Sequence, residues 1–87
     1  MHRLFIENYI KQVTKDDIFK FGALNDIELS EEEVNILYHY LNNYWEEILY
    51  GNSEDVFLDM EKKFDRAKFL KMKEIFSEYF QRYQKFL

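Results

Sequence analysis

Residues 30–51 read SEEEVNILYHYLNNYWEEILYG, and this stretch decides the fold class. Ser30, followed three residues later by Glu33, matches the capping box in which each side chain binds the backbone amide of the other at a helix start. Apolar residues then recur at spacings of three and four, which places them on one side of an α-helix. They are Val34, Leu37, Tyr38, Leu41, Tyr44, Trp45, Ile48 and Leu49. We therefore predict a helix over residues 31–50, ended by a left-handed Gly51.

The rest of the chain shows the same helical spacing, and no stretch sustains the alternation of apolar and polar residues that a strand requires. Four further helices are predicted, at about residues 2–12, 15–24, 54–64 and 66–86. A single helix over the last two ranges remains an alternative, because neither glycine nor proline interrupts them. The sequence predicts one all-α domain over residues 1–87, a small bundle of four to five helices.

Short connections separate the predicted helices. Thr14 is expected to cap the helix that follows it, because its side-chain oxygen can accept from the free amides of the first turn. Asn52 or Ser53 is expected to cap the fourth helix, and Asp65 the fifth, if the chain breaks there. The connector over residues 25–29 carries two apolar side chains, Ile27 and Leu29, which we expect to enter the core.

Composition excludes several classes of protein. The 87-residue chain has no cysteine, so it has no zinc ribbon, thiol nucleophile or disulfide framework. No stretch approaches the ~18 apolar residues of a membrane-spanning helix. Near the start, the acid Glu7 precedes any apolar run of signal-peptide length. We therefore expect a cytoplasmic protein that neither enters nor binds a membrane.

Residues able to carry out catalysis or bind a metal are few. His39 falls opposite the apolar side of its helix, between Asn35 and Asn43, where it has neither an orienting partner nor a pocket. The consecutive acids at 31–33 point to different sides of a helix and do not converge on one ion. The sequence predicts a protein without catalytic activity, cofactor, metal or small-molecule substrate.

Apolar residues outside the main helical stripes suggest an interaction surface. Aromatic residues make up 20% of the chain, and rings serve both as core and as contact surface. The candidate interface residues are Ile36, Tyr40, Leu70, Tyr83, Phe86 and Leu87. Because an exposed apolar patch marks an interface, we predict an interaction or adaptor module that binds a protein partner or itself, as a homodimer. The alternative is the ordinary scatter of exposed apolar residues on any surface.

Charge suggests a second function. Residues 1–50 hold four Lys/Arg against ten Asp/Glu, whereas residues 51–87 hold eight against seven. Basic residues interleaved with Phe64 and Phe69 are typical of a surface for single-stranded nucleic acid. They are Lys62, Lys63, Arg66, Lys68, Lys71 and Lys73. A helical wheel scatters the six around the helix, which favours an ordinary solvated surface. A nucleic-acid-associated protein that uses these residues is therefore kept only as the alternative function.

Two segments carry a family resemblance. Residues 13–21, VTKDDIFKF, followed by residues 27–34, IELSEEEV, resemble the YqfT-like family, a group of small Bacillales proteins defined by a domain of unknown function. The shared pattern is a Thr-capped short helix, an Ile-x-Leu connector and a Ser/Thr-capped longer helix. It extends loosely to KEIF at residues 73–76 and covers about half of the chain. The resemblance implies no activity and no site residues, because the family is uncharacterised.

Overall fold

The computed structural model describes residues 2–84, and the side chains of these except at 2, 79, 80 and 82–84. The described chain is helical without strands. Its five helices are α1 (His2–Gln12), α2 (Lys15–Leu24), α3 (Glu31–Tyr50), α4 (Ser53–Glu61) and α5 (Arg66–Gln84). The predicted all-α bundle is confirmed, with a break over residues 62–65. The predicted end of the last helix, at residue 86, lies outside the described residues.

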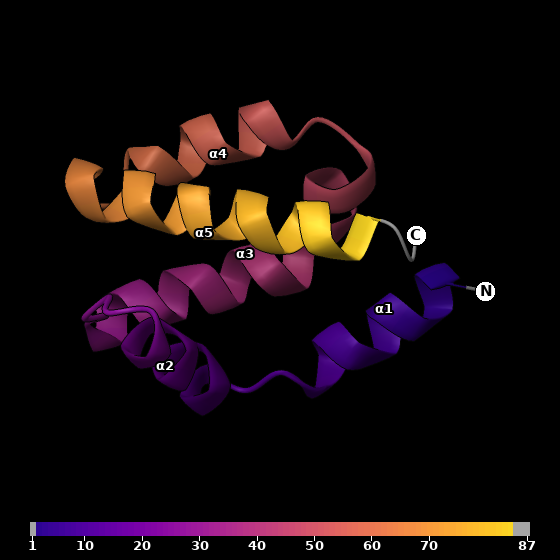
Figure 1. Ribbon diagram of the computed structural model, residues 1–87, viewed down its shortest axis with the longest axis horizontal. Coiled ribbons are helices and arrows are strands. Elements are labelled where there is room, and N and C mark those ends of the chain that lie inside the picture. Colours follow the sequence, from indigo (N-terminus) through magenta and orange to yellow (C-terminus); the bar gives the residue numbers. More distant parts are fainter. Residues whose placement is uncertain (1, 85–87) are drawn as a thin grey trace.

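The long helix α3 runs through the middle of the bundle. Figure 1 shows α4 and α5 on one side of α3, and α1 and α2 on the other. The extended backbone of Thr14 joins α1 to α2, which lie against opposite ends of α3. The radius of gyration is 12.6 Å, close to the ~12 Å expected of a compact chain of this length.

Local sequence signals explain where the helices begin. The Ser30 amide donates to Glu33 Oε1 at 2.8 Å and the Glu33 amide to Ser30 Oγ at 3.1 Å, which confirms the capping box. Thr14 caps α2 as predicted, and Asp17 completes a second box there. The side chains of Asn52 and Asp65 accept from amides in the first turns of α4 and α5. Short-range chemistry therefore fixes these four helix starts.

The expectation that Gly51 is left-handed is wrong. Gly51 ends α3 with a φ of −120°, and its amide donates to the Glu47 carbonyl at 3.1 Å. The left-handed residue is Asp26, with a φ of 58°, in the turn after α2. There the Ile27 amide donates to the Gly22 carbonyl at 2.8 Å, the 6→1 bond of a Schellman motif. This turn reverses the chain and directs Ile27 into the core.

Two apolar clusters fill the bundle. One lies between α2, α3 and the α2–α3 connection, and its buried members are Ile18, Ile27, Leu29 and Val34. The other lies between α3, α4 and α5, and its buried members are Tyr40, Val56, Met60 and Phe69. Leu37 and Met72 contact both clusters. Helix α3 therefore buries two faces, not the single face that its apolar stripe predicted.

Candidate functional site

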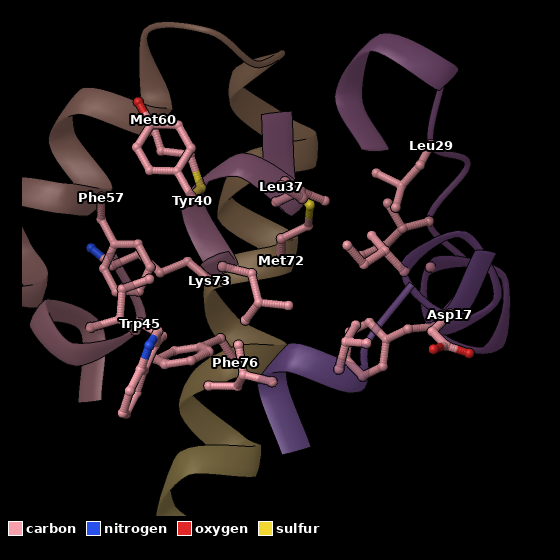
Figure 2. Close-up of a pocket in the computed structure, with 18 of the residues that line it drawn as sticks. Asp17, Leu29, Leu37, Tyr40, Trp45, Phe57, Met60, Met72, Lys73 and Phe76 are labelled. Atoms are coloured by element: carbon pink, nitrogen blue, oxygen red, sulfur yellow. The ribbon is translucent and has the colours of Figure 1, made fainter. Parts of the chain in front are cut away.

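An apolar cavity of about 720 Å³ lies among the helices. Figure 2 shows its lining, which extends from Trp45 and Phe57 at one end to Leu29 and Asp17 at the other. All five helices contribute, with Ile10, Phe21, Leu41, Trp45, Phe57 and Phe76 among the lining residues. Helices α1 and α2 lie apart along α3. Residues of both helices and of the middle of α3 line the cavity. Sequence reasoning missed it, since no single segment carries its pattern.

Few polar groups line this cavity. The Asp17 carboxylate accepts from the Thr14 amide at 2.9 Å, and this bond lowers the pKa of Asp17. Figure 2 shows that carboxylate at the far edge, turned away from the other lining side chains. Lys73 is the one cation among the lining residues that the structure describes, and its Nζ lies 5.6 Å from the centre of the Phe57 ring. The cavity is thus an apolar space with a single positive charge at its wall.

A buried hydroxyl joins α3 to the end of α4. Tyr40 is 2% exposed, and its hydroxyl hydrogen-bonds to Asp59 and accepts from Lys63 Nζ at 2.9 Å. Burial, together with the bond to Asp59, raises the pKa of Tyr40. The same hydrogen bond lowers the pKa of Asp59. The phenol therefore stays protonated at neutral pH. Its proton binds Asp59 and one lone pair accepts from Lys63, so the hydroxyl has a structural role in joining α3 to α4.

The structure places the candidate interface residues in different settings. Tyr40 is buried, which corrects the expectation that it lies on an exposed edge of α3. Ile36 is half-buried against the same cluster, because α4 covers this second face of α3. Leu70 is 49% exposed. The Tyr83 side chain, Phe86 and Leu87 lie outside the described part of the chain.

Highly exposed apolar side chains lie elsewhere, at Leu24 on α2, which is 84% exposed, and at three residues of α1. Phe5 is 79% exposed, Tyr9 71% and Leu4 64%. We call these three residues the α1 patch. Phe5, Tyr9 and Ile10 recur at helical spacing, but of the α1 side chains that the structure describes only Ile10 is fully buried. The apolar face of this short helix is so wide that one neighbouring helix cannot bury it all. The width of this face is visible in the sequence.

Four of the six basic candidates contact other parts of the bundle. Lys68 Nζ binds Glu33 at the start of α3, and Lys71 Nζ donates to the Asp26 carbonyl at 3.1 Å. Lys63 binds Tyr40, and Lys73 lies over the Phe57 ring. The other two, Lys62 and Arg66, are exposed. This arrangement ties α5 and the preceding turn to the rest of the bundle.

His39 lies on the exposed side of α3. Its Nδ1 is 3.2 Å from the Asn43 amide nitrogen, and its ring meets Tyr44 edge-on. Within the described residues, no group of three or more His, Cys, Asp or Glu side chains converges as a metal site. The exposed position of His39 agrees with its place on the helix, but its ring nitrogen has an amide partner in Asn43, which we did not expect from the sequence.

Comparison of the chain with known protein families, with curated proteins and with solved structures finds no significant match. None of the helices over residues 2–84 combines the length and hydropathy needed to cross a membrane.

Proposed function

We propose that this protein is a non-catalytic helical interaction module that binds a protein surface, first of all a second copy of itself, through the α1 patch. The observation that carries the proposal is the exposure of Phe5 and Tyr9, which lie one helical turn apart. Each large ring contributes roughly 150–250 Å² of surface when covered. Burial of this area against an apolar partner is the main favourable term in association.

The weak anchoring of α1 supports this proposal. Helices of fewer than about 12 residues are marginal alone, and α1 has 11 residues. Its contacts include the buried Ile10, an ion pair between Arg3 and Glu46, and Arg3 over the Tyr50 ring at 5.2 Å. The side chains of Arg3 and Glu46 are both more than half exposed. A partner that covers the outward face would therefore stabilise α1.

The charges on α1 indicate what kind of surface would fit. Arg3 pairs with Glu46, and Lys11 pairs with Glu7 at 3.3 Å along the helix. Because these charges are compensated within the chain, the contact surface of the partner is expected to be apolar. A second α1 patch meets this requirement, since an isologous dimer places the same patch on both sides. A cytoplasmic location is part of the proposal and is checked by fractionation of cells.

The proposal is tested by light scattering coupled to gel filtration, from micromolar to millimolar protein. The wild-type chain is expected to shift from monomer to dimer as concentration rises, and the double variant Phe5→Ser/Tyr9→Ser to remain monomeric. Leu58→Ser is the matched control, because Leu58 is 57% exposed on α4, away from the patch. A pull-down from lysate, with the wild type and the double variant as baits, tests for other protein partners. The proposal is overturned if the wild type stays monomeric at every concentration and both baits capture the same proteins.

A further inference from the structure

We infer that the apolar cavity binds an amphiphile with one aliphatic chain and one anionic head group, with the chain among the lining side chains and the head group at Lys73. This ligand site adjoins the α1 patch, because Tyr9 lines the cavity and also belongs to the patch. The inference goes beyond the proposed protein interaction and does not depend on it.

The volume and lining fit a small apolar ligand. Ligand pockets measure about 300–1,000 Å³ and are lined mostly by hydrophobic side chains with a few polar groups, as here at about 720 Å³. Water is a poor occupant, because an ordered water needs two to four polar partners, and the lining supplies few. An apolar cavity that is not filled loses dispersion contacts in proportion to its volume, and a small domain has little stability to spare. Apolar atoms are therefore the favoured contents.

The shape favours a slender chain over a helix of a partner protein. An α-helix with its side chains is about 10–12 Å across, so it needs a much wider groove than a single aliphatic chain does. The lining runs lengthwise from Trp45 to Leu29, as an extended aliphatic chain requires (Figure 2). Leu41 and Ile48 line it with aliphatic groups, and Met72 adds a flexible side chain that adapts to such a chain.

Charge selects the head group. Lys73 is half-buried, and no carboxylate of the described residues forms an ion pair with it. Its Nζ faces the Phe57 ring, a weaker partner than an anion in a partly desolvated site. The carboxylate of Asp17 is compensated by the Thr14 amide at the start of α2. An anionic ligand thus gains a charge-assisted hydrogen bond at Lys73.

Trp45 provides a direct readout, because it is the only tryptophan of the chain and lines the cavity. Titration with 2-bromododecanoate, below its micellar concentration, brings a bromine atom close to the indole, because a head group at Lys73 lies at the Trp45 end of the cavity. The expected result is saturable, one-to-one quenching of Trp45 emission, which unbrominated dodecanoate competes away. Emission that does not respond, or that falls without saturation, overturns the inference. If the protein is a dimer and its Trp45 emission does not change with dodecanoate, a second copy of the chain occupies the cavity. That result also overturns the inference.

The Lys73→Met variant tests the head group, because methionine keeps the apolar stem and removes the charge. It is expected to bind dodecanoate about tenfold more weakly and 1-dodecanol unchanged. Lys62→Met is the matched control, since Lys62 is exposed and does not line the cavity. Leu41→Phe fills part of the space and is expected to weaken both ligands. Equal affinity of the wild type and Lys73→Met for dodecanoate overturns the assignment of Lys73.

Discussion

Lys68 Nζ lies 2.8 Å from Glu33 Oε1, the same oxygen that accepts from the Ser30 amide at the start of α3. One carboxylate therefore caps α3 and binds α5, although the two residues are 35 positions apart in sequence. The Glu33 side chain is 14% exposed and that of Lys68 29%, so solvent screens the pair only in part. This contact links the local signal that starts a helix to the packing of the whole bundle.

Glu33→Gln is expected to reduce the free energy of unfolding by about 1–2 kcal/mol. Glutamine can still accept from the Ser30 amide, but Lys68 loses its counter-charge in a partly buried setting. Urea denaturation followed by circular dichroism measures the change. Glu32→Gln is the control, because Glu32 is exposed on the same turn, and it is expected to change stability by less than about 0.5 kcal/mol. Equal effects of the two variants would contradict the role of the Glu33–Lys68 pair.

The stabilisation from Glu33 is expected to vanish in acid. Burial by itself would raise the pKa of Glu33, but hydrogen bonds from Lys68 and Ser30 outweigh it and lower that pKa. A carboxyl group with a lowered pKa stabilises the fold fully above its unfolded pKa, about 4.3, and loses this contribution as pH falls through the folded pKa. The stability difference between wild type and Glu33→Gln should be constant from about pH 6 to 8 and narrow below about pH 4. If the stability difference between wild type and Glu33→Gln instead grew as the pH fell, the pKa of Glu33 would not be lowered in the folded state, and the prediction would be wrong.

The helix boundaries were predictable because the signals that set them are local. Thr14 and Ser30 bind amides three residues away, so the sequence alone shows where α2 and α3 begin. Tyr40 was placed wrongly because its burial depends on α4, which folds back over a second face of α3. That face becomes visible only when the apolar residues of two helices are considered together.

The candidate sites were predicted less well than the helices. The sequence shows that α1 carries more apolar residues than one neighbour can bury, but the packing of the bundle decides that Phe5 and Tyr9 are the ones left exposed. The cavity is formed by side chains from all five helices, so its lining, including Trp45 and Lys73, has no sequence motif. Sites made by long-range assembly of ordinary core residues leave no mark in a single segment.

Gly22→Ala is expected to destabilise the fold by about 1–3 kcal/mol, even though alanine is the better helix former. A Cβ atom at Gly22 would lie 2.7 Å from Leu29 Cδ1 and 2.9 Å from the Ile27 carbonyl oxygen. The backbone oxygen cannot move without loosening the turn after α2. Thermal unfolding measures the loss. Gly51→Ala is the comparison, because the nearest atom there is the end of the flexible Glu47 side chain, and a smaller loss is expected.

Tyr40→Phe is expected to cost about 1 kcal/mol of stability, because it keeps the buried ring and removes the hydroxyl that joins Asp59 and Lys63. A double-mutant cycle with Asp59→Asn should show coupling, since each change breaks the same bond. Tyr44→Phe is the control, because Tyr44 is 40% exposed. Additive effects of Tyr40→Phe and Asp59→Asn in urea denaturation would contradict the tie between α3 and α4.

Helix α1 is expected to open more readily than the other helices, and this has a direct readout in amide hydrogen exchange. It buries little apolar surface, and low local burial gives a low free energy of local opening. Glu46→Gln removes the exposed ion pair to Arg3 and should speed exchange in α1 by about two- to fivefold, with α3 amides unchanged. Asp16→Asn is the control, because it breaks the pair with Lys20 on α2 and should leave α1 unaffected. If α1 amides of the monomer exchange as slowly as those of α3, then α1 is firmly anchored, and a partner has no weakly held helix to stabilise.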